Sequence, residues 1–414
     1  MIIFPWLTRL GYLPYRDFFD HHGFLLYYLL APFTYDKSLF QLKLFYFVIQ
    51  MLNLYLVLMI LKKSCKFFGL VVGGLLFVFI NYYFSENTLW YETLLTTFFL
   101  ITHILLIMKH VPYKTVLLGT IVAFASFVKP NATVLLFPIL VITKNFKTTV
   151  VFILFWAIVL LYFSFNNGLS ALLSNLFSFN SYLLKHYTAV NFFSRKDTTI
   201  IVIALFTSLY CYLISTKKQR EHIRLLLLMV ITSLIFLGAD KSRLHLYPAS
   251  AFFPILSAVA IEKAKKYQRY FITFFLCTIL AIIGREIGRY YFLYRQEFLP
   301  WTETVISKQV TNGIQIINRG KEPIFILGDN TEAYFFNDLI PPSYFAIKLP
   351  LVEDFFPEYQ EKVITDLQEE EVSYIVIPKP EKEEYKKLVT LHTFIKTQYR
   401  LLLDQPYYTI YKKK

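Results

Sequence analysis

Residues 115–143 read TVLLGTIVAFASFVKPNATVLLFPILVIT, two apolar runs separated by Lys129, Pro130 and Asn131. Each run is shorter than the ~20 residues that an ideal helix needs to cross a bilayer, so a single continuous helix is the competing interpretation. Pro130 lacks a backbone donor and favours a break here. We therefore interpret 115–128 and 132–143 as two separate helices, a choice that sets the topology of the rest of the chain.

The whole chain is too apolar for an ordinary soluble globule. Of its 414 residues 56% are hydrophobic, Phe and Tyr number 43 and 31, and the mean hydropathy is +0.49. We expect an α-helical polytopic membrane protein whose ten spans are 39–61, 67–84, 93–108, 115–128, 132–143, 148–166, 198–215, 224–239, 247–262 and 270–291.

Basic residues lie in short clusters between these apolar runs. With a break at Pro130, every cluster falls on the same side of the membrane, whereas a fused span would put the later clusters on the opposite side. The positive-inside rule assigns that side to the cytoplasm, and it accounts for the net charge of +14 better than a nucleic-acid partner does. The clusters are Lys62, Lys63 and Lys66; Lys109 and Lys114; Lys144 and Lys147; Lys217, Lys218, Arg220 and Arg224; and Lys263, Lys265, Lys266 and Arg269.

This topology predicts three regions. Residues 1–38 form a first extracytoplasmic loop in which Phe24–Phe33 is an interfacial or re-entrant helix, and 39–292 form the membrane domain. Residues 293–414 form a small extracytoplasmic α/β domain, and the loop 167–197 also lies outside the cytoplasm. In this domain we expect strands at Ile324–Leu327, Tyr374–Ile377 and Tyr408–Tyr411, and helices at 353–372 and 381–397.

The predicted start of the chain outside the cytoplasm, without a signal peptide, suggests that an upstream span is missing from this sequence. The alternative is a protein with an external N-terminus that inserts through its first hairpin.

The segment GYLPYRDFFDHHG, residues 11–23, gathers Asp17, Asp20, His21 and His22 just ahead of the apolar series. Ionisable groups beside a bilayer are costly to desolvate, so the cluster is a functional hypothesis. On a helix, Asp17, Asp20 and His21 would share one face. The competing interpretation is a solvated loop in which Asp17 or Asp20 caps a helix, and the spacing leaves both open.

Other polar residues fall at the same predicted membrane face: Glu86, Glu92, Lys129 and the segment 240–248, DKSRLHLYP, which contains Arg243, His245 and Tyr247. A carboxylate can accept a proton from an attacking hydroxyl, and Lys or Arg can neutralise a phosphate leaving group. This combination suits a transferase that uses an anionic lipid donor.

Each of these polar residues also has a purely structural interpretation. Glu86 and Glu92 can solvate a loop, Lys129 can extend to the interface and Arg243 can pair with Asp240. His245 and Tyr247 can be interfacial side chains, and Asp329 after a predicted strand suits either a ligand or a turn.

The GYLPYRDFFDHHG stretch followed by an apolar hairpin resembles the first outer loop of bacterial GT-C membrane glycosyltransferases, such as protein O-mannosyltransferases and aminoarabinose–lipid A transferases. The FVKPN stretch around Lys129 and the RLHLYP stretch after Arg243 resemble later segments of that family. The order of elements is similar along nearly the whole chain.

The resemblance implies transfer of a sugar from a polyprenyl-phosphate donor to a glycan, lipid or protein acceptor outside the inner or plasma membrane, generally with inversion. It implies Asp17 or Asp20 as the catalytic base. The donor phosphate and substrate would be bound by His21, His22, Lys129, Arg243, His245 and Tyr247. Glu92 would be a second carboxylate or a ligand for Mg²⁺ or Mn²⁺.

Two features depart from that family. Gly23 stands where relatives often carry proline. Many relatives also carry their leading acidic motif upstream of the position where this sequence begins, which would leave the catalytic base outside it.

Two rival functions remain open. A transporter or lipid flippase predicts internal pseudo-symmetry and charges near the bilayer midplane, whereas this sequence shows no repeat and places its charges at one face. A truncated, non-catalytic relative that binds lipid or protein partners is the second rival.

Overall fold

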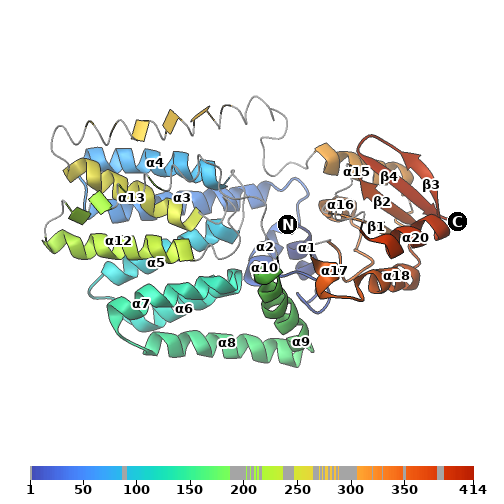
Figure 1. Cartoon of the computed structure of the whole chain (residues 1–414), viewed down its shortest axis with the longest axis horizontal. Coiled ribbons are helices and arrows are strands. Elements are labelled where there is room, and N and C mark those ends of the chain that lie inside the picture. The colour runs from blue at the N-terminus through green and yellow to red at the C-terminus, as the bar shows by residue number, and fades with distance from the viewer. Residues whose placement is uncertain are drawn as a thin grey trace. The chain divides into compact units, whose positions relative to one another are not determined.

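The computed structural model describes residues 2–85, 91–186, 217–235, 247–263, 305–318, 320–328, 330–347, 351–379 and 387–414, with scattered residues between 202 and 213 and between 270 and 288. The chain is mainly helical and carries a small C-terminal sheet (Figure 1). It divides into two compact units. The first unit is Met1–Leu42, Leu161–Tyr187 and Trp301–Lys414, and the second is Lys43–Leu160 and Thr188–Pro300.

The sheet of the first unit is mixed. In the described part of the chain its strands are β1 (Ile324–Ile326), β2 (Tyr374–Pro378), β3 (Tyr399–Asp404) and β4 (Tyr408–Lys413), in the order β1-β2-β4-β3. β1 pairs in parallel with β2, while β4 runs antiparallel to both β2 and β3. The three expected strands are confirmed. β3 was not expected.

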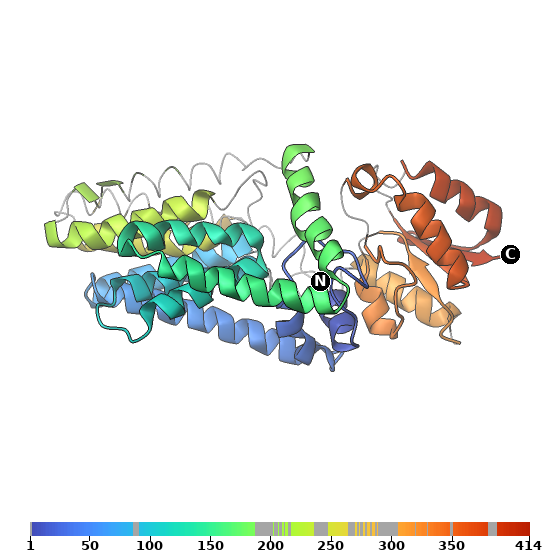
Figure 2. The same cartoon turned by 90° about the horizontal axis from the view of Figure 1, so that it is seen from below.

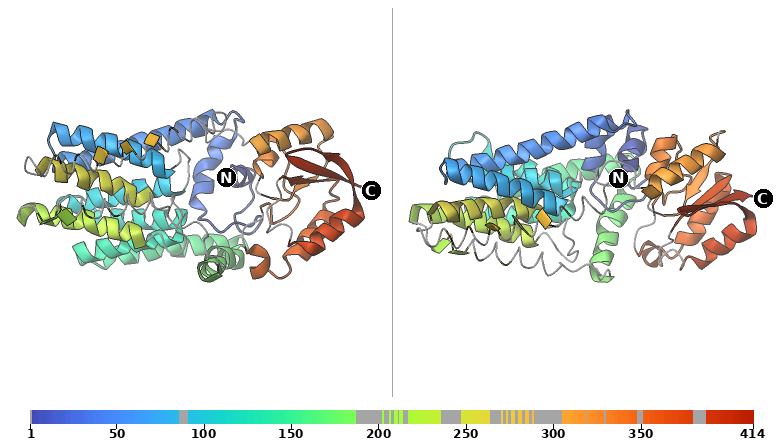
Figure 3. Two further views of the ribbon diagram at one scale, coloured as in Figure 1. Left: turned by 45° about the horizontal axis from the view of Figure 1, so that its top comes forward. Right: turned by 90° about the horizontal axis from the view of Figure 1, so that it is seen from above.

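Helices cover both faces of this sheet. α15 (Val305–Ile317) lies on one face, and α18 (Tyr359–Glu369) and α20 (Val389–Gln398) lie on the other (Figures 1 and 3). The expected helix 353–372 is interrupted at Pro357, which separates α17 (Val352–Phe355) from α18. A proline cannot donate the backbone hydrogen bond that a continuous helix needs there.

The core beneath α18 and α20 also includes side chains from distant parts of the chain. Phe19 and Phe179 are fully buried among Phe325, Val363 and Leu391. The N-terminal loop and the segment 161–187 therefore share one hydrophobic core with the α/β domain. The expected domain boundaries at residues 38 and 293 stay predictions.

The other helices described in the first unit are short. They are α1 (Ile3–Arg9), α2 (Leu25–Leu30), the 3-10 helix η1 (Ala31–Thr34), α9 (Leu169–Leu172), the π-helix η3 (Leu173–Phe179), α10 (Asn180–His186) and α16 (Glu332–Asn337). The apolar segment expected at Phe24–Phe33 is thus α2 followed by η1. α9, η3 and α10 form one continuous rod (Figure 2), so the described part of the expected loop 167–197 is helical instead.

In the described part of the second unit, helices run side by side (Figures 1 and 3). Those that match expected spans are α3 (Phe40–Lys62), α4 (Phe67–Ser85), α5 (Tyr91–Ile107), α6 (Lys114–Val128), α7 (Leu136–Thr143), α8 (Lys147–Phe165), α12 (Lys217–Ile235) and α13 (Tyr247–Lys263). The ends of α3 and α8 belong to the first unit. The expected spans 198–215 and 270–291 lie largely outside the described residues.

The predicted break at Pro130 is confirmed. α6 ends at Val128, and Lys129 is extended, with φ −155° and ψ 119°. The 3-10 helix η2 (Pro130–Leu135) follows and leads into α7. Proline suits this first position of a helix, where no backbone donor is needed.

Small and polar side chains join the helices of the second unit. The Asn53 side chain donates to the Thr93 carbonyl at 3.2 Å and accepts from the Thr97 hydroxyl at 2.8 Å. Gly73 lets α4 approach α13, since a Cβ atom there would lie 3.0 Å from the Cβ of Ala258. Such contacts are typical of helices that pack in an apolar environment.

Two of the described helices, α3 and α8, are long and apolar enough to cross a membrane by length and composition. The other apolar helices that we expected to span are shorter or less uniformly apolar, and ten spans are not confirmed. These two helices are weak evidence of membrane association.

Candidate functional site

The polar segment after α1 is a loop. Gly11 has φ +97°, and Tyr15 has φ +67° although its side chain is fully buried. Because residues 11–23 are not helical, Asp17, Asp20 and His21 do not share a helix face. The helix-cap interpretation is also wrong, since α2 begins after Phe24 and no side chain caps it.

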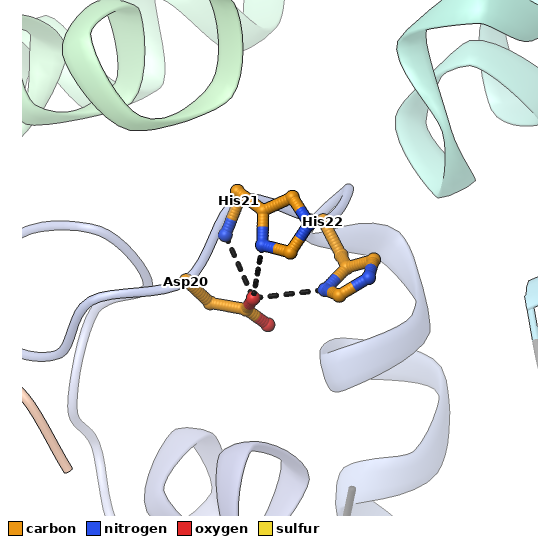
Figure 4. A group of neighbouring side chains, drawn as sticks. All are labelled: Asp20, His21 and His22. Carbon is orange, nitrogen blue, oxygen red and sulfur yellow. Dashed lines mark hydrogen bonds and ion pairs between the residues drawn. The ribbon is translucent and has the colours of Figure 1, made fainter. Parts of the chain in front are cut away.

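Asp20 lies at the centre of this loop and is 1% exposed (Figure 4). Its Oδ1 accepts a hydrogen bond from the backbone N–H of His21 at 2.7 Å. The Nδ1 atoms of His22 and His21 face the same oxygen at 2.8 and 3.4 Å. The hydroxyl of Tyr27 donates to Oδ2. Both carboxylate oxygens are therefore engaged by named groups.

The surroundings of Asp20 keep it ionised. Burial by itself raises the pKa of this carboxyl, but the charge of His22 and the hydrogen bonds from His21 and His22 outweigh burial and hold the pKa well below its usual range. A buried carboxylate is tolerated when it is paired and hydrogen-bonded, as here.

Two distant side chains fix the backbone of the histidines. The Asn180 amide donates to the His21 carbonyl at 2.6 Å, and the Tyr15 hydroxyl donates to the His22 carbonyl at 2.5 Å. The His21 ring packs against the Phe179 ring, with centroids 5.8 Å apart. The two imidazole side chains are 19% and 20% exposed, so they separate Asp20 from solvent.

Tyr344 of the α/β domain ties this loop to the rest of the first unit. Its carbonyl accepts from the Phe19 N–H at 2.8 Å, and its hydroxyl donates to the Tyr15 carbonyl at 2.7 Å. The Asn175 amide donates to that hydroxyl at 2.6 Å. Burial raises the pKa of Tyr344 to about 12, so the hydroxyl keeps its proton at neutral pH.

Asp17 has different partners from Asp20. Its two oxygens accept from Arg16 at 2.7 and 2.8 Å and from the Leu13 N–H at 2.6 Å. Burial raises the pKa of Asp17, but the hydrogen bonds from Arg16 and Leu13 prevail and lower it. These contacts close a turn, and a catalytic role for Asp17 stays a prediction.

The second unit holds the other two described charges that we singled out. Lys129 Nζ lies 2.8 Å from Glu92 Oε1, and their side chains are 18% and 2% exposed. The extended backbone at Lys129 places its side chain beside the first turn of α5. The structure thus pairs the expected phosphate ligand with the expected metal ligand, and both roles stay predictions.

Several other expected site residues lie outside the described residues: Glu86, Asp240, Arg243, His245 and Asp329. Tyr247 is the first residue of α13, and its side chain is not among those described.

Sequence reasoning missed the residues that support Asp20: Tyr15, Tyr27, Asn180 and Tyr344. Tyr15 and Tyr27 each lie seven residues from their hydrogen-bond partner in the loop, so the nearness of tyrosines to the acidic motif was the available signal. Asn180 and Tyr344 are separated in sequence from their partners in the loop by 159 and 329 residues, and no local sequence pattern predicts such contacts.

Asp20, His21 and His22 are also the described side chains that could hold a metal ion, because one ligand atom from each lies within 4.8 Å of the others. Glu92, the expected metal ligand, pairs with Lys129 instead of belonging to this cluster.

No protein-family model matches this chain, and no curated protein matches it in sequence. The resemblance to GT-C enzymes therefore rests on the quoted motifs alone.

Proposed function

We propose that this chain is an integral membrane glycosyltransferase that moves a sugar from a polyprenyl-phosphate donor to an acceptor outside the cytoplasm. The observation that carries the proposal is the buried, ionised Asp20 behind two partly exposed imidazoles. Asp20 also lies in the segment whose sequence resembles the first outer loop of GT-C enzymes.

In this reaction a hydroxyl oxygen of the acceptor attacks the anomeric carbon of the sugar. The bond from that carbon to the phosphate oxygen breaks, and the polyprenyl phosphate leaves with the bonding electrons. The hydroxyl proton must be taken up at the same site. The Asp20 carboxylate either accepts that proton or orients the group that does.

The exposed face of α8 supports a membrane location. Of its most apolar 18 residues only 11% are buried. Val150, Leu154 and Ile158 follow one another at helical spacing and are 55–62% exposed. A long helix with so much exposed apolar surface suits a lipid environment better than water. The ten-span topology, with the α/β domain outside the inner or plasma membrane, is part of this proposal.

Lys129, Arg243, His245 and Tyr247 remain proposed donor ligands, and Glu92 a proposed second carboxylate. The assignment to Asp20 depends on none of them. The acceptor would be a glycan, a lipid or a protein.

Asp20→Asn tests this function. Detergent-opened membranes containing the chain are incubated with a panel of radiolabelled polyprenyl-phosphate sugars, and label entering glycan, lipid and protein fractions is counted. We expect transfer by the wild type and a loss of about 100-fold or more in the variant. Asp36→Asn is the matched control, since Asp36 is an exposed acid of the same unit that hydrogen-bonds Ser38.

Two results would overturn the proposal. One is the absence of transfer with every donor in membranes that contain folded wild-type protein. The other is transfer by Asp20→Asn at the wild-type rate.

A further inference from the structure

Three consecutive residues, Asp20, His21 and His22, bring possible metal-ligand atoms together, and Figure 4 shows both imidazole rings facing the Asp20 carboxylate. The Asp20 Oδ1 atom lies 2.8 Å from His22 Nδ1 and 3.4 Å from His21 Nδ1. In a tetrahedral site with bonds of about 2.0–2.1 Å, neighbouring ligand atoms are roughly 3.3 Å apart. The His21 distance is close to that value, whereas the His22 distance is that of a hydrogen bond, which a bound ion would replace. The ligand atoms of all three residues lie within 4.8 Å of one another.

A hydrogen bond to the second carboxylate oxygen holds Asp20 in place. The Tyr27 hydroxyl donates to its Oδ2, which leaves Oδ1 on the side of the imidazoles. Tyr27 is 1% exposed, and its ring packs against Phe4 and Phe18 with centroids 5.6 and 6.0 Å away. An outer hydrogen bond of this kind orients a metal-binding carboxylate and supports its affinity.

Hydrogen bonds also fix the backbone of both histidines. Asn180 fixes the His21 carbonyl and Tyr15 fixes the His22 carbonyl, at 2.6 and 2.5 Å. Their rings are tilted by 43° to each other, with centroids 4.0 Å apart. The two imidazole side chains are 19% and 20% exposed, so their rings border solvent while Asp20 is buried behind them.

The donor set selects the class of ion. Two imidazole nitrogens and one carboxylate oxygen suit first-row transition metals and zinc, whereas Mg²⁺ and Ca²⁺ prefer all-oxygen sites. We propose that Asp20, His21 and His22 bind one divalent transition-metal ion, with Zn²⁺ as its representative. This assignment differs from the Mg²⁺ or Mn²⁺ site expected at Glu92.

The proposal rests on geometry and does not require the transferase. If both hold, the ion supplies positive charge for a phosphate or hydroxyl oxygen, and Asp20 acts by positioning that ion. Asp20 is then required as a ligand rather than as the proton acceptor.

The test measures metal directly on purified, tag-free, full-length protein. The protein is stripped with a chelator and reloaded with Zn²⁺. The ion is counted by mass spectrometry, and its Kd is found by competition with a chromophoric chelator. We expect one Zn²⁺ per chain with at least micromolar affinity, no comparable binding of Mg²⁺, and loss of the ion in Asp20→Asn and His22→Gln. Co²⁺ loading should give a visible absorption band that the same two variants lack.

Two further variants keep the test decisive where a ligand change impairs folding. Tyr27→Phe alters no ligand, and we expect it to weaken Zn²⁺ binding by about 10–100-fold while one ion still binds. His186→Gln removes an exposed histidine of the same unit and should bind like the wild type. Folded wild type that takes up no Zn²⁺, or a folded His22→Gln that binds it with unchanged affinity, would overturn the proposal.

The outcome is separable from that of the transfer assay. Absence of metal binding together with loss of transfer in Asp20→Asn would remove the ion and leave the transferase standing. Metal binding without any transfer would support the ion site and remove the transferase.

Discussion

Asp20 in the first unit and Glu92 in the second are both 1% exposed, yet they are neutralised in different ways. Asp20 is surrounded by its own neighbours in the chain, two imidazoles and a backbone N–H. Glu92 pairs with the ammonium group of Lys129, which comes from 37 residues further along. A neutral imidazole offers a nitrogen lone pair to a metal ion, whereas a lysine ammonium offers only hydrogen-bond donors. The Asp20 cluster therefore suits metal binding, whereas the Glu92 pair suits a fixed structural role.

The largest expected effect breaks the Glu92 pair. Replacing one partner, by Glu92→Gln or Lys129→Met, should cost about 3–5 kcal/mol of folding stability because the other charge is left buried. The double variant should recover most of that loss. Thermal unfolding in detergent measures it. If both single variants melt like the wild type, the pair is not the structural element that the comparison requires.

A smaller effect is expected where the Asp20 loop meets the α/β domain. Tyr344→Phe removes the hydroxyl that joins the Tyr15 carbonyl to Asn175, and buried polar groups then lose their partners. We expect a loss of about 1–3 kcal/mol in stability. Zn²⁺ binding should weaken as well if Tyr344 helps to position the loop. Melting curves and chelator competition provide the two measurements, with Tyr407→Phe, an exposed tyrosine of the same unit, as the control.

The partly exposed Asp17 gives a pH-dependent counterpart to Asp20. Its folded-state pKa lies below the usual 3.8, so the ionised carboxylate stabilises the fold above about pH 4, and this contribution disappears as the pH falls through the folded-state pKa. Asp17→Asn should therefore cost about 0.5–1 kcal/mol at pH 7, after allowance for solvent screening, and less in acid. Melting temperatures measured from pH 7 down to pH 3 should converge for the two proteins. A constant difference would contradict this account.

The smallest effect belongs to an exposed pair of the first unit. Lys37 Nζ lies 2.5 Å from an oxygen of Asp338, but the side chains are 42% and 51% exposed. Lys37→Met should change stability by about 1 kcal/mol or less, and salt should reduce the difference further. A loss as large as that of Lys129→Met would show that burial does not explain the difference between the exposed and the buried ion pair.

The sequence allowed much of the helical pattern to be predicted, because long apolar runs and their breaks are local signals. The range expected at 39–61 is observed as Phe40–Lys62, and the break at Pro130 follows from the missing donor. β3 was missed because Tyr399–Asp404 follows α20 directly, without a turn residue to mark its start, and most of its side chains are exposed. Within the expected loop 167–197, the described residues from Leu169 to His186 are helical, so the prediction gave too much weight to the Asn and Ser residues there.

The candidate site could be predicted only in part. The motif drew attention to Asp20, His21 and His22, but the expected helix face and helix cap are both wrong. Whether Asp20 or Asp17 is enclosed depends on Tyr27, Asn180 and Tyr344, whose positions follow from the folded first unit. The pairing of Lys129 with Glu92 likewise depends on how α5 and η2 pack, which apolar patterning does not specify.

Two opposed requirements meet at Tyr15. Its left-handed backbone favours glycine or asparagine, and keeping tyrosine there costs on the order of 1 kcal/mol or more. Its hydroxyl, however, secures the His22 carbonyl. Glycine there would relieve the strain, but it would also empty the space of a fully buried ring, and truncation of a large buried side chain costs about 3–5 kcal/mol. Burial of the Tyr15 ring therefore stabilises the same backbone turn that positions His22, so folding stability and the geometry of the loop should be lost together at this position.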